Sequence, residues 1–496
     1  MKKTFSIVCV FFLLVLAQFN SHAANKNVPF QTARSVAAYY FSAMNGKESF
    51  LDEDVDLVQA FHNPQSGEAT LYVFNVGGKG FVIVSGCTAA NPIVAYSAER
   101  TIDGEAIAPS ARYWLEGYSK MVAEAQNEGV DPTPAVEAAW KAVEGQTLGA
   151  ATKSDVVLMT EKWGQGPSHN PTYNLYSPVL WGRSCPTGCG PTAMGQIMHY
   201  WHYPKVGKGQ KNYAEKYTDN EGNVRTRNSV SIRFNQTFYD YDLMPDVSLT
   251  SSSDSASIKA TALLLFHAGV AVGASYGVDG TGAIPDDVSQ AFYRNFKYKT
   301  CFVYHRGQFS DEDWMSSLRQ EIDHHRPVFY AGWEQSERGN PEGGHAFICH
   351  GYQTESPNMF AMNWGWTGSC DGWYDMSTVQ GLDPSAYVFS YDQLCILGLE
   401  PPDDSNAFVG IRQVEPSAVE TFPAYPNPAY DRVTIPCVAP EGGNAALCVY
   451  DMSGRLVEKV SLAAGRQDVT VNVSSYRKGV YAYRVGDGPV RKFVVQ

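Results

Sequence analysis

Positive charge is scarce in this chain of 496 residues, which has 38 lysines and arginines against 51 aspartates and glutamates and a net charge of −13. No basic stripe is present that could replace the counterions of a phosphate backbone, so the sequence argues against a nucleic-acid partner. Hydrophobic residues make up 44% of the chain and charged residues 18%, as in folded globular domains. The length predicts two to four such domains.

Long apolar runs are lacking beyond the N-terminus. No later stretch approaches the length that spans a bilayer, so we expect no membrane-spanning helix in the mature chain. The N-terminus has Lys2-Lys3, an apolar run from Phe5 to Leu16 and small residues from Ser21 to Ala24. This pattern is typical of a signal peptide, which we place at residues 1–24.

Cysteines are too few and too widely spaced for a dense disulfide framework. Of the ten, Cys9 leaves with the signal peptide, and the odd number that remains is consistent with a free thiol. A metal site is not indicated either. His199 and His202 lie three apart, but no carboxylate or cysteine accompanies them at ligand spacing, so we predict that they pack in a helix and that no cofactor is bound.

The run from Cys185 to Pro204, CPTGCGPTAMGQIMHYWHYP, is the most informative stretch. It places Cys189 just before a helix start, with Pro191 in the first turn, where its missing N–H costs nothing. An apolar face follows at helical spacing: Ala193, Ile197, Met198 and Trp201. The positive end of a helix dipole favours a thiolate, the nucleophilic form of cysteine. The alternative is that Cys189 is a small buried hydrophobe.

A nucleophilic thiol needs a base, and residues 339 to 352, GNPEGGHAFICHGY, offer two histidines. His345 lies where a glycine turn becomes a short buried strand, and Gly344 before it leaves room for a substrate backbone. His350 is the rival, but side chains alternate along a strand, so the two histidines face opposite ways. The glycine approach favours His345, and we expect His350 to be packed or on the surface.

A third stretch, FAMNWGW, contains Asn363 and Trp364. An asparagine oxygen that accepts from the second nitrogen of the base fixes its tautomer, and a neighbouring indole shields that bond from water. The alternative is a strand end with ordinary aromatic packing. The occurrence of Cys189, His345 and Asn363 in this order, each in a suitable context, is strong evidence that they act together as nucleophile, base and orienting residue.

These motifs resemble those of the streptopain and interpain peptidases, papain-like cysteine proteases of bacterial pathogens and commensals. The resemblance covers residues 163 to 400 through TGCGPTAMGQIMHYWHYP, GGHAF, NWGW and WGQGPSHNPTYN. It implies an α+β, papain-like catalytic domain, which we place at residues 153–400, and a function in hydrolysing peptide bonds of proteins and peptides.

The resemblance also implies further site residues. Gln165 occupies the position of a glutamine that donates its side-chain N–H to the oxyanion hole together with the Cys189 backbone N–H. The substrate cleft would use the backbone of a small-residue loop and the glycine before the base, which correspond here to Gly280, Thr281, Gly282 and Gly344.

The region before the catalytic domain, residues 25–152, predicts an α+β module. We expect helices at residues 32–44, 110–127 and 135–143 and a β-hairpin formed by residues 71–76 and 80–85. Small and polar residues at 144–154 indicate a linker or cleavage region. The resemblance implies an inhibitory pro-domain, and the alternative is a permanent structural domain.

The end of the chain changes character after a linker at residues 401–420. Short β-rich runs separated by turn residues predict a small all-β sandwich at residues 421–496. Its YPNP, VYDMSGR and GVY motifs resemble the sorting domain of the Bacteroidetes type IX secretion route, which implies export across the outer membrane to the cell surface or medium. The alternative is a carbohydrate-binding or adhesive sandwich.

The sequence therefore favours a secreted cysteine endopeptidase that is made as an inactive precursor. The alternative is a surface adhesion or haem-acquisition protein whose peptidase-like domain is degenerate, but the intact set of candidate catalytic residues argues against it. Transglutaminase or amidase chemistry on a papain-like core would use the same cysteine and histidine.

Overall fold

The computed structural model describes residues 26–46, 48–104, 106–148, 155–219, 221–335, 341–354, 356, 358–380, 382, 391–402, 420–439, 445–451, 455–486 and 490–496. The predicted signal peptide lies outside the described residues, as do most of the predicted cleavage region at 144–154 and most of the linker at 401–420.

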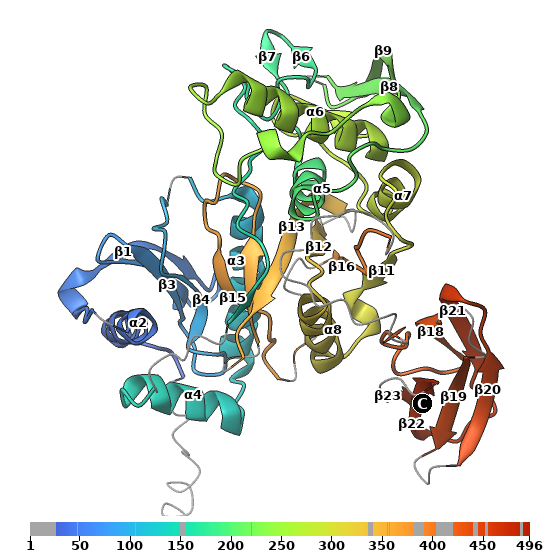
Figure 1. Ribbon diagram of the computed structural model, residues 1–496. Helices are drawn as coiled ribbons and strands as arrows, with labels where there is room; N and C mark the ends of the chain where they lie inside the picture. The colour runs from blue at the N-terminus through green and yellow to red at the C-terminus, as the bar shows by residue number, and fades with distance from the viewer. Residues whose placement is uncertain are drawn as a thin grey trace, which may run out of the picture.

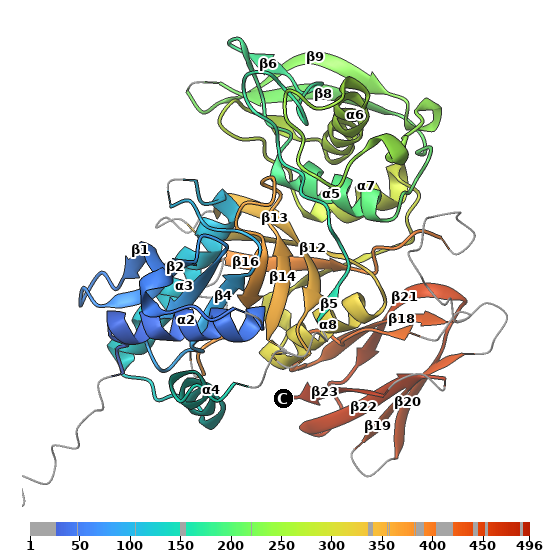
Figure 2. The ribbon, with the colours of Figure 1, turned by 60° about the vertical axis from the view of Figure 1, so that its left-hand side comes forward.

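One antiparallel sheet runs through both the N-terminal and the central region (Figures 1 and 2). Its strand order is β1-β2-β3-β4-β15-β14-β13-β12-β16-β11, and β5 (Val156–Val157) pairs with β13. In that order the strands span Val55–His62, Ala69–Val76, Gly80–Ser85, Ile93–Ser97, Gly372–Asp375, Met359–Asn363, Pro341–Tyr352, Val328–Gln335, Tyr391–Leu397 and Phe302–His305. The two regions are joined where β4 pairs with β15, through Tyr96 opposite Trp373 and Ala95 opposite Tyr374.

Helices α3 (Pro109–Glu128) and α8 (Asp311–Asp323) cover one face of this sheet and share a core with it. Helix α3 begins with a proline in its first turn and ends at Gly129 in the left-handed conformation, two signals that set its length. Helices α2 (Phe30–Asn45) and α4 (Pro134–Glu144) cover the opposite face of the N-terminal strands.

The remaining face of the central strands packs against a second subdomain, drawn in green in Figure 1. Its helices are α5 (Cys189–Tyr200), α6 (Ser255–Val272) and α7 (Asp286–Asn295). Its strands are β6 (Val179–Leu180), β7 (Arg183–Ser184), β8 (Lys211–Thr218), β9 (Val224–Ile232) and β10 (Ser275–Tyr276). Helix α6 is long and apolar enough to cross a membrane by length and composition, but 56% of it is buried and it packs on α5, as expected of a core helix.

The C-terminal region is a two-sheet sandwich with its own core, as the sequence predicts. One sheet has the order β17-β18-β21 and the other β20-β19-β22-β23. These strands span, in chain order, Glu420–Thr421, Arg432–Ala439, Ala446–Asp451, Leu456–Ser461, Gly465–Asn472, Gly479–Val485 and Arg491–Val495. The sandwich lies beside α8 (Figure 2), and its Phe422 contacts Phe302 of β11 at the end of the large sheet.

Candidate active site

Cys189 is the first residue of α5, where the sequence predicts it. The chain enters the helix through Gly188 at φ 93°, and a Cβ there would lie 2.7 Å from the Thr281 carbonyl oxygen, so this position requires glycine. Thr192 donates from its hydroxyl to the Gly188 carbonyl at 2.8 Å and so fixes the first turn. The cysteine is therefore held at a rigid helix start.

Two effects act in opposite directions on the Cys189 thiol, since a helix start favours the thiolate and burial disfavours it. Burial raises the pKa of Cys189, and hydrogen bonds from the backbone of Ala346, Gly190 and Cys189 itself lower it by less. Burial therefore acts against the thiolate that the helix start favours. The contact with Ala346 also shows that the strand of the candidate base passes directly beside the sulfur.

His345 lies near the start of β13, but its side chain faces the N-terminal region. Alternation along this strand sends Ala346 and Ile348 into the core beneath α5, and Phe347 into the core beneath α3. His345 shares the side of Phe347, and its ring lies 4.7 Å from that of Tyr113 on α3. Among the described residues its Nδ1 is buried without a hydrogen-bond partner, and burial lowers the pKa of His345 to about 4.

The candidate nucleophile and the candidate base therefore lie on opposite sides of one strand, and burial disfavours the charged form of each. An ion pair between them, the form that would attack a peptide carbonyl, is not assembled in this structure. This is the arrangement expected of a precursor whose N-terminal region holds the base.

Asn363 does not contact His345, contrary to the sequence-based expectation. It stands opposite Ile348 in the β13–β14 register and so points toward α5. Its Oδ1 accepts from the Gly365 N–H at 3.0 Å and from Gln196 Nε2 at 3.2 Å, and its Nδ2 donates to the Glu161 carbonyl at 2.6 Å. The amide is fully occupied on the far face of the strand from the imidazole.

Gln196 is a residue that the sequence analysis missed. It is fully buried in α5, and its Oε1 accepts from the Trp163 N–H at 3.1 Å and from Asn363 Nδ2 at 3.1 Å. It thereby ties the segment that leads to Gln165 to strand β14. The available signal was a polar residue seven positions after Cys189, on the apolar face of an otherwise hydrophobic helix.

Trp364 is completely buried in the core between the sheet and α3. Its ring lies 4.6 Å from Phe347, the second residue after the candidate base, and its Nε1 donates to the Cys370 carbonyl at 3.0 Å. The hydroxyl of Ser110 on α3 donates to its carbonyl oxygen at 3.3 Å. The indole supports the strand of the base and does not cover an asparagine–histidine bond here.

Gln165 lies beside the start of the nucleophile helix and is 8% exposed. Its carbonyl oxygen accepts from the Thr187 N–H at 3.0 Å, and the Thr187 hydroxyl is 2.9 Å from that of Thr192 in α5. The backbone at Gln165 is thus hydrogen-bonded to Thr187, two residues before Cys189. From this position the Gln165 side-chain amide can donate to an oxyanion formed beside the sulfur.

The loop proposed to bind substrate reaches the same helix start. The Thr281 hydroxyl donates to the Pro186 carbonyl at 2.6 Å. Gly280 and Gly282 have open space where a Cβ would be, so an extended chain can approach both. Gly344, on β13 next to His345, is exposed. A Cβ at Gly344 would lie 2.7 Å from the Trp333 ring, so the position has no room for a side chain.

His350 lies away from the thiol, in the wall of a cavity of about 1190 Å³ between the N-terminal and central regions. Its Nδ1 is buried without a partner among the described residues, and burial, with a smaller effect of Lys162, lowers its pKa to about 4. Asn363 and Glu161 line the same cavity. His350 is thus a packed residue, as expected.

The fold gives His199 two carboxylate neighbours, although none stands at ligand spacing in the sequence. Its Nδ1 is 2.9 Å from Glu161 Oε1 and 3.9 Å from Asp246 Oδ1, and the three side chains lie close enough together to hold a metal ion. Its Nε2, however, is 2.9 Å from the Met244 carbonyl, so both ring nitrogens are engaged within the protein. The partners are distant in sequence, and local ligand spacing therefore could not reveal them.

Comparison with known protein families agrees with this arrangement. Residues 163–374 match the Peptidase C10 family, residues 25–122 match the Spi protease inhibitor family, and residues 423–496 match the secretion system C-terminal sorting domain. The central region is thus similar to the cysteine peptidases of the C10 family. The chain is therefore a cysteine endopeptidase precursor with an inhibitor-like pro-domain and a sorting domain for secretion across the outer membrane.

Two curated proteins are similar to most of this chain. It is 27% identical over 412 residues to the thiol protease/hemagglutinin PrtT of Porphyromonas gingivalis, a match that covers 80% of this chain and 44% of PrtT. The chain thus spans less than half the length of that relative. It is 28% identical over 367 residues to streptopain of Streptococcus pyogenes serotype M1, covering 70% of this chain and 85% of streptopain.

The fold is also found in a solved precursor structure. The prointerpain A fragment of Prevotella intermedia matches with a TM-score of 0.54 at 23% identity, covering 70% of this chain and 99% of that one. This likeness confirms the papain-like α+β fold.

Proposed function

We propose that Cys189 and His345 are the nucleophile and the general base of the peptidase once the pro-domain has left. His345 takes the thiol proton, and the thiolate attacks the peptide carbonyl to form a tetrahedral oxyanion held by the Gln165 amide and the Cys189 N–H. His345 then protonates the leaving amine, and water hydrolyses the thioester to release the acid and the free thiol.

The observation that carries this proposal is the Ala346 N–H at the Cys189 sulfur. The backbone next to His345 already touches the thiol, so no movement of the strand is needed to form the pair. A change of the His345 side chain from the Tyr113 side toward α5 would be sufficient. The substrate backbone would then lie between Gly280, Thr281, Gly282 and Gly344. Asn363 would support the site through its hydrogen bonds with Gln196 and Glu161, unless its side chain turns with His345.

For latency, we infer that residues 25–152 form the inhibitory pro-domain and residues 153–400 the catalytic domain. The ring contact of Tyr113 with His345 and the shared core of α3 support this division. Release would come from a cut within residues 149–155, most simply by the enzyme itself. The signal peptide at 1–24, the linker at 401–420 and the sorting domain at 421–496 complete the proposed export route.

Time courses of the purified precursor test the assignment of the nucleophile. Cys189→Ala should remain full length and should not cleave casein, because no thiolate can form the acyl-enzyme. Cys185→Ala is the matched control, since Cys185 lies four residues away, is in no disulfide and is fully buried. It should shorten and cleave like the wild type, and an inactive Cys185→Ala with an active Cys189→Ala would refute the assignment. Amine incorporation into casein in place of cleavage would instead indicate transglutaminase chemistry.

A further inference from the structure

The C-terminal sandwich makes a structured contact with the peptidase domain through the edge strand of the large sheet. Strand β11 is last in the strand order and pairs on one side only, with β16. Phe422 is 1% exposed and is part of the core beneath α3 and α8, with its ring 5.7 Å from that of Phe302 on β11. Tyr425 packs 5.4 Å from Tyr304 of the same strand. Edge strands favour unwanted pairing, and the sandwich covers this one.

Polar contacts beside these rings add specificity. The Asn427 N–H donates to the Gln308 carbonyl at 3.1 Å, and Asn427 Nδ2 donates to Asp313 Oδ2 on α8 at 3.3 Å. Asn427 lies in the YPNP segment, so the first residues of the sorting domain are themselves part of the contact.

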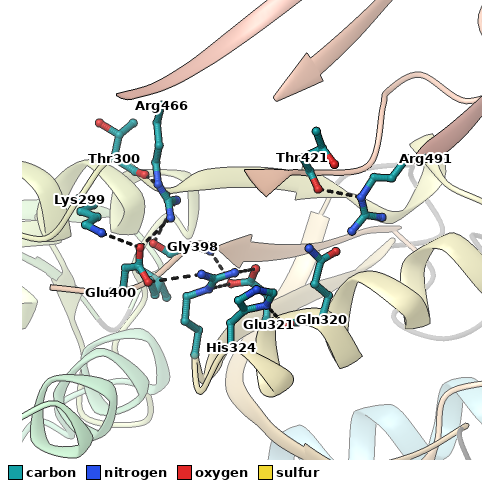
Figure 3. Close-up of polar contacts among 12 residues, drawn as sticks. Lys299, Thr300, Gln320, Glu321, His324, Gly398, Glu400, Thr421, Arg466 and Arg491 are labelled. Atoms are coloured by element: carbon teal, nitrogen blue, oxygen red, sulfur yellow. Dashed lines mark hydrogen bonds and ion pairs between the residues drawn. The ribbon is translucent and has the colours of Figure 1, made fainter. Parts of the chain in front are cut away.

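Arg466 of strand β21 enters a slot in the peptidase domain (Figure 3). Its guanidinium donates to the Thr300 carbonyl at 3.0 Å, to the Gly398 carbonyl at 3.4 Å and to Glu400 Oε1 at 3.0 Å. It also lies over the rings of Phe302 and Phe422, at 5.9 and 5.5 Å from their centroids. The floor of the slot is Gly398, where a Cβ would lie 1.9 Å from the guanidinium.

The slot is deeply buried. The side chain of Arg466 is 7% exposed and that of Glu400 is 6% exposed. Burial alone would raise the pKa of Glu400, but Arg326, Arg466 and Lys299 together lower it to about 2. The carboxylate is therefore charged at any physiological pH and presents a permanent acceptor to the arginine.

The peptidase side of the slot is satisfied without the sandwich. Arg326 pairs with Glu321 at 2.8 Å and with Glu400 at 3.3 Å, and Lys299 pairs with Glu400 at 3.0 Å. The two carboxylates of the peptidase domain are thus balanced by its own two cations. Arg466 adds a third cation to this cluster. An interface whose receiving side is already balanced can open and close without leaving an unpaired carboxylate.

We propose that the C-terminal sandwich is a docked partner of the peptidase domain, held by Arg466 in the Glu400 slot and by Phe422 over β11. It stays bound without a covalent link when the segment between them is cut. The sorting domain is then a separable subunit, and loss of the connection alone does not expose the edge of β11.

A cut chain tests this directly. A site for a sequence-specific protease is placed within residues 403–419 of the full-length Cys189→Ala precursor, and the cut protein is analysed by size-exclusion chromatography and sedimentation. The two pieces should travel together as a one-to-one complex. Arg466→Met keeps the length and apolar stem of the side chain but removes its charged hydrogen bonds, and it should weaken the complex by about tenfold to 100-fold.

Arg432→Met is the matched control, because Arg432 is exposed at the opposite end of the β18–β21 pair and should not affect the complex. Glu400→Gln changes the slot from the peptidase side and leaves the sandwich sequence intact, so a similar weakening cannot be attributed to a misfolded sandwich. Pieces that separate immediately without any substitution, equal affinity of Arg466→Met and the parent, or a complex of twice the mass, which would indicate exchange between two copies, would each overturn the proposal.

Discussion

At the scale of single residues, the contact between Tyr113 and His345 explains how the precursor can be inactive with all its candidate catalytic groups present. The imidazole is neutral, its Nδ1 has no partner among the described residues, and an aromatic ring from the pro-domain lies against it. Latency then depends on the direction in which the His345 side chain points, because the backbone beside the Cys189 thiol already has the position that the active pair needs.

Replacing Tyr113 should shift this balance. In Tyr113→Ala the ring contact is lost and His345 can turn toward α5, so Cys189 should react faster with iodoacetamide and self-cleavage should begin earlier. Tyr113→Phe keeps the ring and should behave like the wild type. Thermal unfolding of both variants controls for lost packing, and equal labelling rates in Tyr113→Ala and the wild type would argue against restraint of the base by this ring.

Gln165 permits a second prediction at the same scale. In the processed enzyme Gln165→Ala should lower kcat by roughly 100-fold to 1000-fold, the scale of losing one oxyanion donor, with a smaller change in KM. The measurement is hydrolysis of a short peptide substrate at saturating concentration. A variant with nearly unchanged kcat would remove the Gln165 amide from the oxyanion hole.

The sequence located these residues better than it located their contacts. Cys189 at a helix start and His345 at the start of a strand follow from local patterns that the structure repeats. The partners of Asn363 could not be predicted, because they depend on the register of β13 against β14 and on Gln196 and Glu161, which lie far from Asn363 in the chain. Local spacing carries no information about such pairs.

At the scale of elements, the loop into α5 is as important as the helix itself. Gly188→Ala should lower the unfolding temperature and the activity together, because φ 93° is strained for alanine and its Cβ would lie 2.7 Å from the Thr281 carbonyl. Gly280→Ala is the stability control, since a Cβ there meets nothing within 4 Å. Similar unfolding temperatures for the two variants would contradict this account.

The predicted helices and hairpin of the pro-domain correspond to α2, α3, α4 and the pair β2–β3, within two residues at each end. Strands β1 and β4 were not predicted. Strand β1 has a single fully buried residue and is interrupted by irregular pairing, and β4 is a short apolar run without a diagnostic period. The pairing of β4 with β15 joins segments almost 280 residues apart, and nothing local indicates it.

At the scale of the whole molecule, the stability of the precursor should depend on pH through a carboxyl group at the boundary between the pro-domain and the peptidase domain. Burial raises the pKa of Asp371 to about 7, and this carboxyl lines the cavity between the two domains. Between the unfolded pKa of about 3.9 and this value the folded chain binds one more proton, so stability falls as pH rises through that window. Asp371→Asn retains the acceptor for the Trp364 N–H and should flatten this decline in thermal unfolding. Asp56→Asn, an exposed carboxylate, is the control and should not.

The pro-domain and the peptidase domain share a core and a sheet. We therefore predict that a cut in the connecting segment is not enough for activation. Helix α3 shares a core with the catalytic sheet, and β4 continues that sheet, so the pro-domain should stay bound and thiol labelling should stay slow after cleavage within residues 149–154. Leu115→Ala leaves a cavity in the shared core, which typically costs about 2–5 kcal/mol, and should accelerate labelling of the cut protein. Glu99→Ala removes only an ion pair with Lys162 at an exposed rim and should change the rate little, because such pairs contribute about 0–1 kcal/mol. Full labelling at the moment of cleavage would show that the pro-domain is held by its covalent connection and not by this core.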